Sequence, residues 1–436
     1  MTSTPPSVSA PGDAADAPVG SDVSMSAAND ASANPGVDGD VGGGGSADAA
    51  SPGTDATPVP PTGKRLTIAA GAFARDHSIV SFSLPDRAGQ SLLLMGDGGV
   101  TLPLQVASDG TATFVLPALA AGQTATFSIT TAAAPLPVGV DLVQEANGVR
   151  FVSGASNMLR FQTQGVLPAG AAAMYLRGGY IYPYYTPAGG IPTDDYPPSH
   201  PHQHGIWTAW LSAQFGGRTI NFWDFTGGVR GKVDFESLDG TWKGPVHSGL
   251  SAKLAHIDLS AAQPVTALNE QWIITAYKTH DGPPPYFVFD LSSRQEAATA
   301  MPVVINQATY SGFGMRGARP WVTGPVTYLN SEGMNRATGD GTASRWAYLG
   351  GTVGGNMVGA AMLGHPQNFR APQRVRFNPM EPYWAFAPMR TGSFTIDAAT
   401  PLVNHFRIVT LDGPPDVALI DRLWKDFAMP ATVTVQ

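Results

Sequence analysis

The chain has 436 residues, no cysteine and a formal net charge of −8 at pH 7. The absence of cysteine excludes disulfides, thiolate metal ligands and a cysteine nucleophile, and it leaves the redox compartment open. Eight aspartates and no Lys or Arg stand in the first 63 residues, which leaves 25 acidic residues to balance 25 basic ones. The rest of the chain is therefore neutral, without a basic field that would favour nucleic acid or an anionic membrane.

Residues 1–63 consist mainly of Ala, Gly, Ser, Pro and Asp. So little apolar surface cannot offset the entropy of ordering, and the segment is predicted to be a disordered tether. Its start, MTSTPPSVSA, lacks the basic and apolar regions of a signal peptide. Such a tether is nevertheless common in exported bacterial proteins, often lipoproteins. We therefore expect an extracytoplasmic protein, periplasmic or at the cell surface, whose signal sequence and lipid tether were lost with a missing N-terminus.

Residues 64–135 contain short runs of alternating polar and apolar residues, among them RLTIAA, SIVSFSLP, TLPLQVA and TATFSIT. Turns rich in Gly, Pro and Asp separate these runs. Short alternating strands at this spacing predict a small β-sandwich or barrel module. The stretch PLPVG at 135–139 is interpreted as a linker.

Residues 140–436 continue as strands, for example VRFVSG, YFVFDLSSRQ and NHFRIVTLDG. Only 416–428 shows helical periodicity, with Val417, Ile420, Trp424 and Phe427 on one face. No stretch of about 18 apolar residues occurs, so no membrane span is expected. The economical fold class is mainly β, with a large β-sandwich following the small module.

Three histidines stand at alternate positions in the segment 180–224, His200, His202 and His204, beside aspartates and tryptophans. On a strand they would share one face and could hold a divalent metal with an open position. Pro201 indicates instead a loop in which imidazoles act as acids, bases or hydrogen-bonding groups. Structural histidines are the third alternative. Further candidates from this segment are Asp195, to orient an imidazole, and Trp207 and Trp223, to form stacking walls.

Candidate partners of the histidines lie further along the chain. Glu236 and Glu270 are possible carboxylate bases, although a lone strand glutamate is more often solvent-facing. His247 lies in a Gly/Pro turn that resembles a site loop. Substrate-binding candidates near the ends of apolar runs are His365, Asn368, Arg370 and Arg316. Three further histidines lack such neighbours and are interpreted as structural: His256, His280 and His405.

Several motifs resemble those of one known family. They are TDDYPPSHPHQHGIWTAW, INFWD, FVFDLSS, YSGFGMRGA, NSEGMNRATGDGTASRWAYLGG and LGHPQNFRAPQ, in this order. Over residues 140–425 they look like the PmoA-like domain family of unknown function, often labelled methane oxygenase PmoA. Where members often read His-Pro-His-His, this chain has Gln203. The label conflicts with the sequence, because a true particulate methane monooxygenase subunit is embedded in the membrane. The resemblance implies a β-supersandwich similar to galactose mutarotase-like folds, and an association with sugar catabolism.

The leading hypothesis is an exported carbohydrate-active protein that acts on a sugar or glycoside by histidine and carboxylate acid–base chemistry. The expected partner is a carbohydrate or another small polar ligand, and the hypothesis requires no cofactor. One alternative is a metal-dependent oxygenase or hydrolase that uses the histidine cluster. Another is a non-catalytic glycan-binding surface protein. Convergence of the histidines with His247, His365 and a glutamate on one pocket would favour the enzyme, and scattered positions would favour binding.

Overall fold

The computed structural model describes residues 64–225, 228, 230–279 and 285–436, so the predicted tether of residues 1–63 lies outside the described residues. The prediction of a mainly β fold is confirmed, because the described residues form four antiparallel sheets and a single α-helix. Short 3-10 helices lie at Pro85–Arg87, Asp97–Gly99, Ala173–Tyr175, Arg319–Val322 and Pro388–Thr391. Among the residues described, none of the helices has the length and apolar character needed to span a bilayer.

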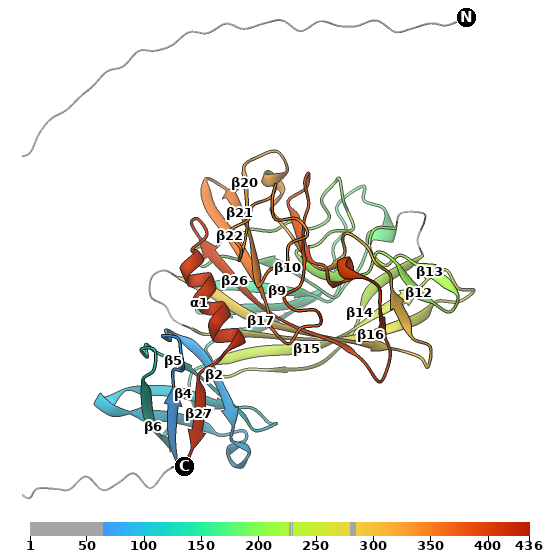
Figure 1. The fold of residues 1–436 in the computed structure, drawn as a ribbon. Helices are drawn as coiled ribbons and strands as arrows, with labels where there is room; N and C mark the ends of the chain where they lie inside the picture. The colour runs from blue at the N-terminus through green and yellow to red at the C-terminus, as the bar shows by residue number, and fades with distance from the viewer. Residues whose placement is uncertain (1–63, 226–227, 229, 280–284) are drawn as a thin grey trace, which may run out of the picture. The chain divides into compact units, whose positions relative to one another are not determined.

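Two eight-stranded sheets form the body of the fold (Figure 1). The long-stranded sheet contains, in spatial order, β14 (Gly231–Trp242), β15 (His247–Asp258), β16 (Val265–Tyr277), β17 (Tyr286–Ala297), β26 (Leu402–Asp412), β22 (Asn356–Gly364), β21 (Trp346–Val353) and β20 (Val326–Asn330). The short-stranded sheet contains β23 (Val375–Phe377), β24 (Tyr383–Phe386), β19 (Gly312–Arg316), β11 (Ile206–Ala209), β10 (Tyr180–Tyr184), β9 (Ser156–Gln162), β8 (Gly148–Ser153) and β7 (Asp141–Glu145).

The two sheets pack face to face around the main core. Trp272 on β16 lies 5.5 Å from Phe313 on β19, and Phe313 stacks on Phe406 of β26 at 4.5 Å, measured between ring centroids. The alternating burial along β17 follows from this packing, since every second side chain points into the core. A four-stranded sheet of β13 (Arg218–Ile220), β12 (Ala213–Phe215), β18 (Val303–Ile305) and β25 (Phe394–Ile396) completes the body.

The N-terminal strands form a separate seven-stranded sheet with its own apolar core. Its order is β2 (Ser78–Ser83), β5 (Thr111–Leu116), β4 (Thr101–Val106), β3 (Ser91–Gly96), β6 (Thr124–Thr131), β1 (Arg65–Ala69) and β27 (Thr432–Val435). Strand β27 falls within the range 140–436 assigned to the large domain but pairs with β1. The boundaries at 64–135 and 140–436 stay predictions, because residues 64–436 belong to one compact unit.

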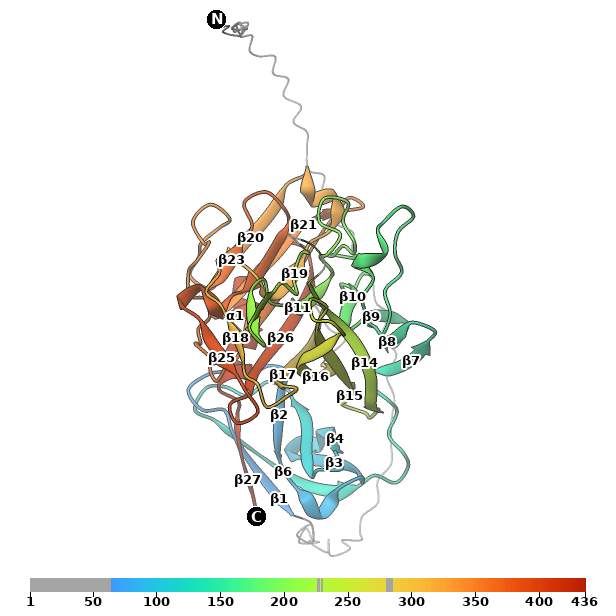
Figure 2. The ribbon, with the colours of Figure 1, turned by 90° about the vertical axis from the view of Figure 1, so that its right-hand side faces the viewer.

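Helix α1 (Val417–Ala428) is the helix predicted over 416–428. The Asp416 side chain caps it by accepting a hydrogen bond from the Leu419 amide at 2.9 Å. Three residues of the predicted apolar face, Ile420, Trp424 and Phe427, pack on the sheet, whereas Val417 at the first turn is 44% exposed. Leu419 and Leu423 complete the buried face. The apolar cluster that they join covers part of the outer face of the long-stranded sheet: Tyr286, Val288, Trp346, Tyr348, Ala361, Leu363, Val409 and Leu411. Helix α1 contacts β22 and β26, whereas β14, β15 and β16 form one end of the same sheet (Figure 2).

Candidate functional site

The three predicted histidines lie on residues 185–205, which join β10 to β11 and are called the histidine loop. The loop contains no strand and turns tightly, since the Gln203 amide donates to the His200 carbonyl at 2.9 Å. Pro201 within this turn has no amide to give to a strand ladder. The three imidazoles therefore do not share one strand face, and each has different surroundings.

His204 forms a buried pair with Asp195, called the dyad. His204 Nδ1 lies 2.6 Å from Asp195 Oδ1, and the Tyr180 hydroxyl donates to Asp195 Oδ2 at 2.9 Å. The His204 ring is fully buried, stacked on Tyr180 at 4.3 Å and edge-on to Tyr196 at 4.8 Å. These contacts fix the ring and leave His204 Nε2 without a hydrogen-bond partner. An imidazole oriented by a carboxylate in this way presents its other nitrogen to a reacting group.

Burial keeps both members of the dyad uncharged near neutral pH. It raises the pKa of Asp195 to about 8 against the opposing hydrogen bond from Tyr180, and nearby Asp194 adds to the rise. Burial also holds the pKa of His204 well below its usual range, helped by the Arg177 guanidinium. A protonated Asp195 donates to Nδ1, so Nε2 carries the ring proton. Once Asp195 ionises, the ring proton belongs on Nδ1 and Nε2 offers a lone pair.

A small pocket joins the dyad to further polar groups. His204 lines it together with His202 and Arg177, whose Nη2 atom is buried and has no hydrogen-bond partner. Burial lowers the pKa of His202 to about 3, against the effect of Asp224, so this ring is neutral. The remaining lining is largely aromatic and apolar, with one lysine: Tyr175, Leu176, Phe222, Trp223, Phe225, Lys232 and Val233. The pocket measures about 10 Å³, room for roughly one water molecule, so only a hydroxyl-sized group fits between these side chains as they stand.

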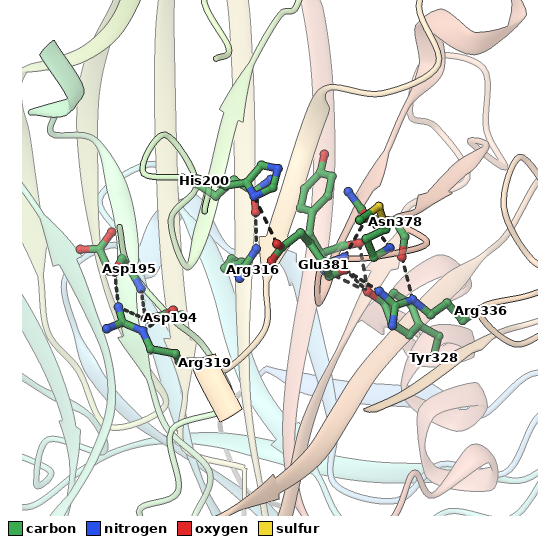
Figure 3. A network of polar contacts seen from close by, with 12 residues as sticks. Asp194, Asp195, His200, Arg316, Arg319, Tyr328, Arg336, Asn378 and Glu381 are labelled. Atoms are coloured by element: carbon green, nitrogen blue, oxygen red, sulfur yellow. Dashed lines mark hydrogen bonds and ion pairs between the residues drawn. The ribbon is translucent and has the colours of Figure 1, made fainter. Parts of the chain in front are cut away.

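A second polar cluster lies on the other side of the loop turn (Figure 3). His200 Nδ1 lies 3.4 Å from Glu381 Oε1, and Arg316 Nη2 lies 2.8 Å from Glu381 Oε2. Neither atom of the arginine–glutamate contact makes a well-aligned hydrogen bond, so this contact is an ion pair without directional bonding. Arg316 Nη1 donates to Gln203 Oε1 at 2.7 Å, which ties strand β19 to the histidine loop. Gln203, the departure from the family pattern, thus has a structural partner.

Buried polar atoms without partners gather around the histidine loop. Native proteins leave few such atoms, and each one points to an absent water, ligand or strained site. Among the described residues, those in this region are Arg177 Nη2, Tyr196 OH, His200 Nδ1, His204 Nε2, Trp207 Nε1, Arg316 Nε and Nη2, Glu381 Oε2 and Tyr383 OH. Their concentration makes this loop, with the strands beside it, the candidate functional site.

The predicted aromatic walls occupy two layers. Trp223 lines the pocket, whereas Trp207 is fully buried behind it with the ring centroids 5.1 Å apart. Trp207 therefore supports Trp223 and does not itself meet a ligand in the pocket.

The predicted carboxylate partners do not join the dyad. Glu236 is exposed on β14. Glu270 is buried between the sheets, where its oxygens bond to His256 Nε2 at 2.8 Å, Trp272 Nε1 at 2.7 Å and the Ser293 hydroxyl at 2.5 Å. His256, which was interpreted from the sequence as structural, is thus paired with Glu270 in the core.

The other predicted residues are scattered. His247 lies on β15, where its Nδ1 accepts a hydrogen bond from Trp242 Nε1 at 3.1 Å. His365 and Asn368 line a different pocket of about 220 Å³. Arg370 donates to the carbonyls of Pro388, Gly392 and Ser393, a purely structural set of contacts. The predicted convergence of His247, His365 and a glutamate with the histidine loop is therefore not observed. This outcome counts against the enzyme in the form first predicted, and it leaves only His204 and Asp195 to support acid–base chemistry. His405 also lies away from the histidine loop, and His280 lies outside the described residues.

The metal alternative finds no arranged ligand set. Within the described ranges no group of three or more His, Asp or Glu side chains is placed to hold a metal ion. In the dyad, Nδ1 of His204 is already committed to Asp195, and His200 faces Glu381 across the loop.

The comparisons with known proteins concern the body of the fold. The model of a family of unknown function, DUF6807, matches residues 148–425. This match agrees with the resemblance over 140–425 in pointing to a family of unknown function, and it names no activity. None of the curated proteins compared with the chain matches it.

Two solved structures are similar at low identity. A glycosyl hydrolase family 38 protein from Enterococcus faecalis shares 7% identity at a TM-score of 0.37, covering 86% of this chain and 48% of its own. This chain thus spans about half the length of that protein. A galactose mutarotase-like protein from Lactobacillus casei shares 8% identity at a TM-score of 0.28, covering 63% of this chain and 100% of its own. TM-scores this low leave the function to be argued from the chain's own residues.

Proposed function

We infer that this chain, which belongs to the family of unknown function DUF6807, is a carbohydrate-active enzyme acting on a sugar or glycoside by acid–base chemistry. The observation that supports this most is His204, whose Nδ1 is held by Asp195 while its buried Nε2 has no partner. A buried nitrogen left unpaired costs stability, so its persistence is best explained by a group that it meets during function.

The dyad can first act as an acid and then, after it has given up a proton, as a base. With Asp195 protonated, His204 Nε2–H gives its proton to a ligand oxygen while the Asp195 hydroxyl gives its own to Nδ1. The product is an Asp195 carboxylate with Nδ1–H, whose Nε2 lone pair then takes a proton from a ligand hydroxyl. The pKa of about 8 for Asp195 places this exchange near physiological pH, where general acid–base catalysis is most effective.

The pocket supplies the other needs of a sugar hydroxyl. Arg177 Nη2 is an unpaired donor for an oxygen that gains negative charge, and His202 is a neutral ring that can donate or accept. Trp223, Phe222 and Tyr175 give the pocket an apolar lining, which excludes bulk water from around the entering hydroxyl. Because the pocket admits only a hydroxyl-sized group, we propose that one hydroxyl enters and the ring stays at the mouth.

The test is turnover by purified protein against a panel of free sugars and nitrophenyl glycosides. Anomeric exchange is followed by polarimetry and glycoside cleavage by absorbance. His204→Ala is expected to reduce the rate on any sugar that turns over by about 10²–10⁴-fold. The matched control, His77→Ala, removes a partly exposed histidine in the bend before β2 and should leave the rate unchanged. Full activity of both His202→Ala and His204→Ala would refute the proposal.

We also propose an extracytoplasmic location, on the Ala/Gly/Ser/Pro/Asp composition of residues 1–63. Cell fractionation of the natural host, with detection by an antibody against the folded domain, tests it. Recovery in the cytoplasmic fraction alone would refute it. The proposed chemistry rests on the dyad and takes nothing from the resemblance to proteins labelled methane oxygenase.

A further inference from the structure

A groove crosses the outer face of the long-stranded sheet, away from the dyad. It consists of two hollows, of about 790 Å³ and about 310 Å³, which share Ile273 and Thr275 of β16. The larger hollow extends over β14 and β15 to the strands of the N-terminal sheet, and the smaller one reaches β17, β26 and the end of helix α1. Ile273 lies between them and is 38% exposed, so the middle of the groove floor is apolar and open.

The groove contains a tryptophan that is held in place before any ligand binds. Trp242 Nε1 donates to His247 Nδ1 at 3.1 Å, and Trp242 pairs directly with Gly249 across the strands. A Cβ at Gly249 would lie 2.1 Å from the Trp242 ring atom Cζ2, so only glycine lets the indole lie there. His247 is fixed in turn, because Gln105 Oε1 accepts from its amide and Gln105 Nε2 donates to its carbonyl, both at 3.0 Å. A ring fixed from two sides loses little entropy when a ligand stacks on it.

Ion pairs neutralise three of the four charged residues that line the groove. Asp290 contacts Arg407 through both carboxylate oxygens, at 2.8 and 2.9 Å, and Asp239 lies 3.2 Å from Lys253. Lys243 pairs with Asp141 at 2.5 Å. The fourth, Asp109, accepts a hydrogen bond from the Thr111 amide at 2.8 Å. The groove therefore offers no unpaired positive charge, which argues against a phosphate or a nucleic acid as its ligand.

The histidines of the groove are uncharged as well. Burial lowers the pKa of His247 to about 4, against the effect of Asp290. Burial also lowers the pKa values of His365 and His405, which lie 6.0 Å apart in the smaller hollow. Small hydroxyl side chains complete the floor, namely Ser251, Thr275 and Ser292. Neutral imidazoles and hydroxyls both donate and accept hydrogen bonds, as sugar hydroxyls do.

We propose that this groove binds an uncharged oligosaccharide chain, with Trp242 as the stacking platform. The groove is elongated, and it combines an apolar floor, a fixed indole ring and neutral hydrogen-bonding groups, which are the features that a glycan chain requires. A purely apolar ligand would leave the hydroxyl groups of the groove without hydrogen-bond partners. The inference rests on the proposed function for its ligand class, and it adds a binding site at which no reaction takes place. It is tested by binding, so the two proposals fail separately.

The experiment is affinity electrophoresis and calorimetry of the full chain with named neutral glycans: cellohexaose, xylohexaose, mannohexaose and laminarihexaose. The expected result is binding of at least one of them. Trp242→Ala should weaken it at least tenfold, and Gly249→Ala should weaken it by displacing the same ring. His204→Ala should leave it unchanged while abolishing turnover.

A second variant guards against misfolding. Ile273→Lys places a long charged side chain on the open groove floor without removing a buried residue, and it should also weaken binding at least tenfold. Its matched control, Val100→Lys, makes the same change at an apolar residue that is 42% exposed outside the groove. Binding that survives both Trp242→Ala and Ile273→Lys, or no binding of any of the four glycans by the unaltered chain, would overturn the proposal.

Discussion

The dyad predicts that Asp195→Asn locks His204 in one protonation form. The Tyr180 hydroxyl donates to Asp195 Oδ2, so an amide at this position turns its oxygen toward Tyr180 and its NH₂ group toward His204 Nδ1. Nδ1 then accepts a hydrogen bond at every pH, and Nε2 keeps the ring proton. The base form of His204 is lost, while the shape of the site is kept.

Two magnitudes follow from this change. Loss of the base form should lower the turnover rate by about 10²–10⁴-fold. The folded-state pKa of Asp195, about 8, lies above an unfolded value of about 3.9. The folded chain therefore retains a proton between these values, and its stability falls as the pH rises through this window by about 1.4 kcal/mol per pH unit relative to Asp195→Asn.

Nitrogen NMR of chain labelled in its histidine rings measures the tautomer directly and needs no substrate. In the unaltered protein the His204 resonances should change from the Nε2–H to the Nδ1–H pattern around pH 8, whereas Asp195→Asn should show Nε2–H throughout. Asp194→Asn is the matched control, because it removes the neighbouring carboxylate that pairs with Arg319. It should keep the transition and move its midpoint slightly lower. An Nδ1–H pattern already present at pH 6 would refute the reasoning.

Three further predictions concern stability. Glu270→Ala leaves His256 without its partner in the core and should cost about 3–5 kcal/mol in urea denaturation at pH 7. Burial raises the Glu270 pKa, but the hydrogen bond and charge of His256 together with the hydrogen bonds from Ser293 and Trp272 outweigh it, so the folded value is lowered. This stabilisation is therefore present above about pH 4.3 and lost as the pH falls through the folded pKa, and a pH-independent cost would contradict it. Asp416→Ala should cost about 1 kcal/mol by removing the cap of α1, and thermal denaturation that shows no change would contradict the capping role. Deleting residues 430–436 should speed hydrogen exchange of the amides of β1 that now pair with β27, and unchanged protection would contradict that pairing.

The local features of the fold were predictable from sequence because they depend on short-range patterns. Alternating residues predicted the strands, and the stretch 416–428 predicted helix α1. Of the predicted apolar face of α1 only Val417 was wrong, since it continues the apolar periodicity but lies exposed on the first turn. Asp195 and His204 were both proposed from one segment, and they can pair because they lie nine residues apart on one loop.

The rest of the site depends on strand pairing, which no local pattern specifies. Strand β11 pairs with β19, and this register brings Arg316 to Gln203, 113 residues away in sequence. Glu381 joins them through the pairing of β24 with β19. Glu381 was therefore missed, although its place between two prolines in the segment NPMEPYW marked a constrained turn. Tyr180 and Arg177 were missed because neither residue belongs to a sequence motif that indicates a reaction.

Strand β27 has a consequence for how the protein is made. Its partner β1 is synthesised before every other strand described, whereas β27 follows all of them. Until then, the β1 edge of the N-terminal sheet has unpaired backbone groups, a surface on which other strands add. Arg75, next to this sheet, likewise has no ion-pair partner until α1 has been synthesised, because it pairs with the buried Asp426 at 2.8 Å. The N-terminal sheet is thus completed only after the strands of the two eight-stranded sheets have been synthesised.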